Sequence, residues 1–206
     1  MESVSFTQMK YGNREDYMFL QDLEHGYIRE TTERIMDSLN RLENGITGYK
    51  ISRLRHSIQT ASRAWRDGAD IDWITSALLH DIGDLHAPHN HGEYASTILK
   101  PYVREQCQWV IATHGAFQMI YYGQHLEKYN QHAREKYRGH RFFQDCVDFC
   151  ERWDQASFDP TYPDLPLAFF KPMLEKVLSR APYDPAIVNA DPSPLVNSEL
   201  AAERKK

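Results

Sequence analysis

The stretch DWITSALLHDIGDLHAPHNHG, residues 72–92, decides the fold of this chain. Its first half is apolar on nearly every side, which is typical of a central buried helix. Its second half, from His80 to Gly92, gathers four histidines and two aspartates into thirteen positions. We expect His80 and Asp81 to lie inside this buried helix. A fully buried Asp81 without a partner would cost several kcal/mol, so we expect a cation or a dense set of hydrogen-bond donors beside it.

Helical periodicity extends outward from this stretch in both directions. Alternating strand patterns are nearly absent, and the fold class is therefore predicted to be all-α. Besides the central helix, the predicted helices cover residues 31–45, 52–68, 91–103, 104–115, 142–158 and 166–180.

The chain of 206 residues is long enough for one well-packed domain. We expect a single helical domain over residues 1–180, beginning with an irregular arm over residues 1–25. Four prolines and a charged end predict a loosely packed tail over residues 181–206.

Composition excludes several classes of partner. The net charge is −5, so neither a nucleic-acid surface nor an anionic membrane surface is indicated. No apolar run approaches the length of a membrane span, and no signal peptide is recognisable. Three cysteines fit reduced, buried thiols, so we expect a cytoplasmic protein. The oligomeric state is left open.

Imidazole nitrogens and carboxylate oxygens near His80 and Asp81 would suit iron, manganese or zinc. Further ligands are spread over the other predicted helices: His56, His91, His114 and Asp154. Helical bundles build metal sites in this way, with one ligand from each of several helices. Any one of these histidines alone would be read more simply as a hydrogen-bonded core residue.

The ordered set resembles the HD-domain metalloprotein superfamily over roughly residues 50–160. The resemblance implies an HD-type helical bundle with a buried dinuclear site, in which Asp81 bridges two metals. The first metal would take His56, His80 and Asp154, and the second His91 and His114. His86 and His89 compete with His91 for its place, and we favour His91 because it begins a helix.

Most HD-domain proteins are phosphohydrolases, but a smaller branch are mixed-valent di-iron oxygenases similar to myo-inositol oxygenase. Tyr27-x-x-Glu30 resembles a segment of the oxygenases that cleave organophosphonates, in which the tyrosine occupies the second iron before substrate arrives. Asp84 stands where many family members have a basic residue that contacts an oxyanion. Both features favour the oxygenase branch, with Asp81, Tyr27 and Glu30 as catalytic residues.

The resemblance thus implies two iron ions, Fe(II)/Fe(III), and O2 as co-substrate. The substrate would be a 1-hydroxy-2-(trimethylamino or amino)ethylphosphonate, cleaved at its C–P bond to glycine betaine (or glycine) and phosphate. Arg152 is our first choice as the cation for the phosphonate, with the basic run of residues 132–141 as an alternative. Glu30 and Asp84 would meet the ammonium end, and Gln118 stands where the aminophosphonate enzyme would have a basic contact.

Three alternatives are kept. A metal-dependent phosphohydrolase acting on a nucleotide or phosphate ester is the main one. A related oxygenase for another substrate, such as a polyol, and a non-catalytic binding module are the others.

Overall fold

The computed structural model describes residues 2–205, and within them every regular element is helical, which confirms the predicted all-α class. Residues 1 and 206, the outer ends of the predicted domain and tail, lie outside the described residues. The helices are α1 (Arg14–Arg29), α2 (Thr31–Arg41), α3 (Arg53–Arg66), α4 (Ile71–Leu79), α5 (His91–Leu99), α6 (Glu105–Tyr122), α7 (Phe143–Phe149), α8 (Leu167–Leu178), α9 (Pro185–Val188) and α10 (Ser198–Glu203). Short 3-10 turns occupy Met9–Tyr11, Leu42–Asn44, Ile82–Leu85, Gly123–His125 and Ala133–Tyr137, and one π-helical turn occupies Cys150–Asp154.

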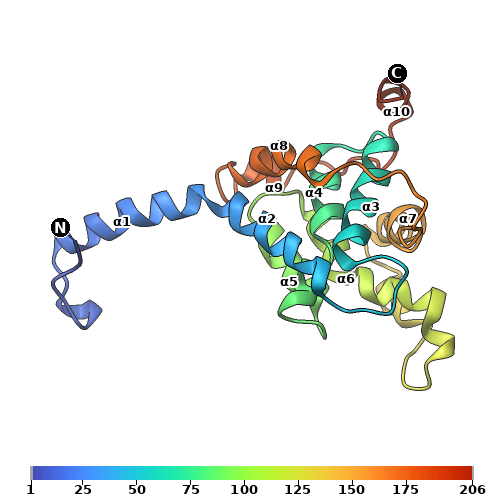
Figure 1. Cartoon of the computed structure of the whole chain (residues 1–206), viewed down its shortest axis with the longest axis horizontal. Helices are drawn as coiled ribbons and strands as arrows, with labels where there is room; N and C mark the ends of the chain where they lie inside the picture. Colours follow the sequence, from blue (N-terminus) through green and yellow to red (C-terminus); the bar gives the residue numbers. More distant parts are fainter. Residues whose placement is uncertain (1, 206) are drawn as a thin grey trace.

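Helix α4 is the centre of the bundle, as its composition predicts. All residues from Asp72 to Leu79 are buried, and α3, α6 and α8 pack around it (Figure 1). The indole of Trp73 on α4 lies 6.0 Å from that of Trp153, and Trp153 lies 5.8 Å from Phe149, ring centre to ring centre. These rings join α4 to α7 and the π-helical turn, which carries Asp154.

The end of α4 differs from the prediction in one respect. We expected His80 and Asp81 inside the buried helix, but α4 ends at Leu79 and a 3-10 turn begins at Ile82. His80 and Asp81 therefore lie at the junction between two elements. Both side chains remain buried. They also point to the same place, because His80 Nε2 lies 3.1 Å from Asp81 Oδ2.

The predicted irregular arm is wrong for residues 14–25, which form most of α1. A capping box starts this helix: the Asn13 side chain accepts a hydrogen bond from the Asp16 amide, and the Asp16 carboxylate accepts one from the Asn13 amide, each at 3.0 Å. Figure 1 shows α1 extending away from the body, with the N-terminus at its far end.

The tail is packed more closely than expected. Ser193 accepts a hydrogen bond from the Trp73 indole at its carbonyl, Leu195 is buried, and Arg204 donates to the carbonyls of Trp65 and Ala69. These contacts join residues far apart in the sequence, so the proline-rich composition of the tail did not indicate them.

Among residues 2–205, none of the helices combines the length and the apolar composition needed to cross a bilayer.

Candidate metal centre

Four histidines converge from four places in the bundle. His56 lies on α3, His80 directly after α4, His91 at the first position of α5, and His114 on α6. The Nδ1 atoms of His56, His80 and His114 lie 2.8, 2.8 and 2.7 Å from the carbonyl oxygens of Ser157, Ala77 and Ile111. A proton on Nδ1 that is donated to a carbonyl leaves the Nε2 lone pair free, which is the usual arrangement of a metal-binding histidine.

The first cluster consists of His56, His80, Asp154 and one oxygen of Asp81. The Nε2 atoms of His56 and His80 lie 3.2 and 3.1 Å from Asp81 Oδ2, respectively. The same two atoms lie 3.2 and 3.5 Å from Asp154 Oδ1. The two Nε2 atoms are themselves 3.1 Å apart. Four potential ligand atoms thus surround one point, and all four side chains are almost completely buried.

The second cluster uses the other oxygen of Asp81. Its Oδ1 atom lies 3.3 Å from His91 Nε2 and 3.4 Å from His114 Nε2, and these two nitrogens are 3.2 Å apart. Burial lowers the pKa of His91, which favours the neutral imidazole that ligates metals. Asp81 therefore connects the two clusters through its two carboxylate oxygens, the geometry of a bridging ligand.

Two further observations fit a cation at the first cluster. Asp154 Oδ2 is buried and has no hydrogen-bond partner among the described residues, and such a group is costly unless a ligand satisfies it. Although burial disfavours a charged imidazole, Asp81 and Asp154 raise the pKa of His80 to about 10. The carboxylates thus stabilise positive charge at this point. The mixed nitrogen and oxygen donor set suits iron, manganese or zinc.

A cavity of about 490 Å³ opens beside both clusters. Apart from the candidate ligands, its walls are mainly aromatic and polar, and they include the side chains of Tyr49, Arg53, Gln118, Tyr121, Tyr122 and Phe158. We call this space the metal cavity. Its volume suits a small molecule that reaches both clusters at once.

Arg53 is a site residue that the sequence analysis missed. It is the first residue of α3, its side chain is only 10% exposed, and its guanidinium forms ion pairs with Asp81 and Asp84. Burial opposes its charge, but Asp81 and Asp84 raise its pKa further above the usual range. Its position three residues before His56, on the same face of a helix, was the available indication.

The other predicted substrate contacts lie at different places relative to the metal cavity, and Gln118 and Asp84 lie at it or next to it. Gln118 lines the metal cavity, and its contact with a substrate stays a prediction. Asp84 is nearby, but its Oδ2 atom lies 2.8 Å from Arg53 Nε, so its charge is already paired. Asp84 does not line the metal cavity, so the expectation that it meets the ammonium end of a substrate gains no support and stays a prediction.

Tyr27, Glu30 and Arg152 lie outside the metal cavity. The Tyr27 side chain is 62% exposed on α1, where Arg34 covers its ring at 3.6 Å, and Glu30 is exposed beside Arg34. Arg152 is exposed on the π-helical turn, whereas Asp154 on the same turn is buried. In the basic run, the Arg138 and Arg141 side chains pair with Glu135 and Glu105. None of the residues named in this paragraph, apart from Asp154, belongs to the two clusters or lines the metal cavity.

The family model described as HD domain matches part of this chain. The match covers residues 53–141. This stretch includes five of the six converging side chains, and Asp154 lies beyond its end. No curated protein matches the chain. The match supports the HD-type bundle expected from the sequence, and together with the buried clusters it supports a metal-dependent HD enzyme.

Proposed function

We propose that this protein is a di-iron oxygenase that uses O2 to cleave the C–P bond of a 1-hydroxy-2-(trimethylamino or amino)ethylphosphonate. The products would be glycine betaine (or glycine) and phosphate. The observation that carries the proposal is the pair of adjacent ligand clusters joined by the two oxygens of Asp81. A dinuclear centre of this kind holds two ions close enough for one small substrate to reach both.

Two iron ions, when bound, would supply the redox chemistry and the site of O2 activation. The residues of the chain provide the geometry around them. The Nδ1 hydrogen bonds of His56, His80 and His114 fix the direction of each imidazole. The side chain of Phe158 stacks on His56 with ring centres 4.2 Å apart, which keeps water away from that face of the first cluster.

The metal cavity also suits the proposed substrate. Its aromatic wall includes Tyr49, Tyr121 and Tyr122, and aromatic faces attract ammonium and quaternary ammonium groups. Its only arginine or lysine, within the part of the chain that the structure describes, is Arg53. An anionic group at one end of a substrate and a cationic group at the other thus both find complementary surfaces.

A metal-dependent phosphohydrolase is the second candidate, and the placement of Tyr27 and Glu30 favours it. The resemblance to the phosphonate oxygenases depends partly on these two residues, and both lie outside the metal cavity. Arg53 would bind a phosphate ester as well as a phosphonate.

Phosphate release with and without O2 distinguishes the two functions. The full chain, loaded with Fe(II) and partly oxidised, would be incubated with a set of 1-hydroxyphosphonates and phosphate monoesters. Release from a hydroxyphosphonate that requires O2, together with an EPR signal from a coupled Fe(II)/Fe(III) pair, supports the oxygenase. Release from a monoester in the absence of O2 supports the hydrolase and contradicts the oxygenase.

A further inference from the structure

We infer that Arg53 is the anion-binding residue of the metal cavity, and that it takes the tetrahedral PO3 group of a phosphonate or phosphate. The inference deepens the proposed function, on which it rests for the identity of the whole substrate. It assigns to Arg53 the role that the sequence had suggested for Arg152.

The guanidinium of Arg53 is held from two sides. Its Nε atom donates to Asp84 Oδ2 at 2.8 Å, and its Nη2 atom donates to Asp81 Oδ2. The Cζ atom lies 5.5 Å from the centre of the Tyr49 ring, which in turn stacks on Phe158. A side chain fixed in this way loses little entropy when a ligand binds to it.

The same guanidinium has donors to spare. Arginine carries five N–H groups, and the hydrogen bonds to Asp84 and Asp81 use Nε and Nη2. The Nη1 atom makes no hydrogen bond within residues 2–205, and Arg53 lines the metal cavity. A planar fork with free donors beside a cavity is suited to the oxygens of a PO3 group.

Charge balance favours an anion at this place. Three carboxylates, those of Asp81, Asp84 and Asp154, face the single positive charge of Arg53. Two metal ions in the clusters, each with a charge of at least +2, would more than neutralise the remaining two negative charges. The loaded site would then carry an excess of positive charge, which a doubly charged PO3 group would offset.

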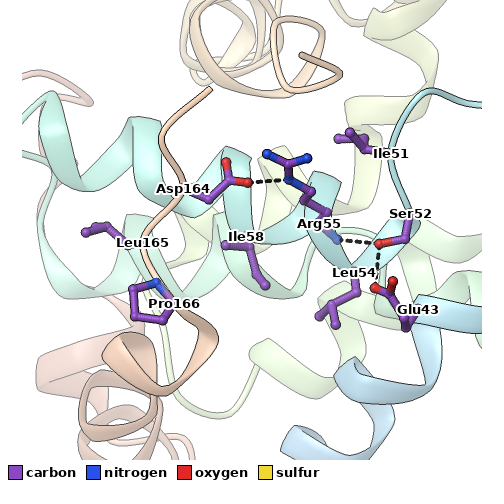
Figure 2. Close-up of a pocket in the computed structure, with 9 residues that line it drawn as sticks. All are labelled: Glu43, Ile51, Ser52, Leu54, Arg55, Ile58, Asp164, Leu165 and Pro166. Carbon is purple, nitrogen blue, oxygen red and sulfur yellow. Dashed lines mark hydrogen bonds and ion pairs between the residues drawn. The ribbon is translucent and has the colours of Figure 1, made fainter. Parts of the chain in front are cut away.

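A matched control lies two residues further along α3. Arg55 points into a different surface hollow, of about 540 Å³, where its Nε atom lies 2.5 Å from Asp164 Oδ2 (Figure 2). None of the six candidate ligands lines that hollow. Replacing Arg55 changes the net charge of the protein as much as replacing Arg53 does, but it leaves the metal cavity intact.

The test is titration calorimetry of the metal-loaded full chain with inorganic phosphate and, separately, with methylphosphonate. The Arg53→Gln variant should bind both probes at least ~10-fold more weakly, because a charge-assisted hydrogen bond is lost. The Arg53→Lys variant, which keeps the charge but not the fork, should fall between this variant and the wild type. The Arg55→Gln control should stay within about twofold of the wild type.

A second variant keeps the inference testable if Arg53→Gln folds poorly. Asp84→Asn removes a negative charge beside Arg53, and the amide oxygen of asparagine can still accept the hydrogen bond from Arg53 Nε, so this variant should bind phosphate as tightly as the wild type or more tightly. Metal content is measured on every variant. Unchanged phosphate affinity in Arg53→Gln, weaker affinity in Asp84→Asn, or a loss of phosphate binding that only follows a loss of metal would each overturn the inference. The O2 experiment above is independent: anion binding at Arg53 without O2-dependent cleavage would contradict the proposed function alone.

Discussion

Gly83 packs directly against the backbone of His91. A Cβ atom added to Gly83 would lie 2.4 Å from the His91 carbonyl oxygen and 2.6 Å from its Cα atom. The turn after Asp81 and the first residue of α5 therefore approach each other as closely as a side chain of one hydrogen permits. This approach brings His91 Nε2 to within 3.3 Å of Asp81 Oδ1.

Replacing Gly83 with alanine should therefore affect the second cluster more than the first. The new methyl group meets backbone, which cannot rotate away, so α5 must move and His91 with it. We expect the bound metal, measured by elemental analysis after dialysis, to fall from two ions per chain toward one. Gly139→Ala is the control, because no heavy atom lies within 4 Å of the position of its Cβ. Two ions retained in Gly83→Ala would mean that the second cluster does not depend on this contact.

Asp154 should be required for the first metal. Asparagine has nearly the same size as aspartate but lacks the charge, and Asp154 Oδ1 lies 3.2 Å from His56 Nε2. We expect Asp154→Asn to weaken binding of one of two metal ions by at least ~10-fold in a competition titration with a chelator. Glu151→Gln, on the exposed side of the same turn, is the matched control and should bind both ions normally.

Tyr27 provides a test of where α1 lies. Because its ring is 62% exposed and covered by Arg34 outside the metal cavity, Tyr27→Phe should leave the EPR spectrum of the iron-loaded protein unchanged. A changed spectrum would show that the tyrosine reaches iron, which requires α1 to fold back onto the body.

The three cysteines should be unreactive in the folded protein. Cys107, Cys146 and Cys150 are buried, and burial raises the pKa of Cys107 and of Cys150 well above the ordinary value. A raised pKa lowers the fraction of thiolate, so raising the pH from neutral to mildly alkaline should not make these thiols react. A chromogenic disulfide reagent should detect no thiol in native protein and three in denatured protein; a fast native reaction would contradict the packing.

Gly68 tests the contact between the tail and the body. It has a φ of +78°, and a Cβ there would lie 2.1 Å from the Asn197 carbonyl oxygen. Gly68→Ala should therefore lower the free energy of unfolding by about 1–3 kcal/mol, measured by urea denaturation, with Gly139→Ala again as the neutral control. An unaffected midpoint would indicate that residues 193–204 contribute little to stability.

The helices and the converging ligands could be predicted because both depend on local patterns. Apolar spacing predicted α3, α4 and α6, and the residue types at His56, His80 and Asp81 are those that share a metal. The choice of His91 over His86 and His89 followed from its position at a helix start, and the structure places His91 beside Asp81.

Arg53 was missed because Arg152 lies closer to Asp154 in the sequence, although the position of Arg53 one turn before His56 was a local indication. Arg152 is two residues from Asp154, but neighbouring residues on a helix point in different directions, and Arg152 is exposed. The charge of Asp84 was likewise interpreted without its partner, which lies 31 positions away in the chain. Pairing between distant side chains is not encoded in any local pattern.

The π-helical turn at Cys150–Asp154 makes the site sensitive to chain length. The Gln155 amide donates to the carbonyl of Cys150 at 3.0 Å, five residues back rather than four, so the turn contains one residue more than an α-helical turn. Deleting a single residue between Cys150 and Asp154 would remove the wider turn and change the direction from which the carboxylate enters the first cluster. Point changes at the exposed positions Glu151 and Arg152 leave that pitch alone. Related proteins should therefore tolerate amino-acid substitutions at these two positions better than an insertion or deletion of one residue in the turn.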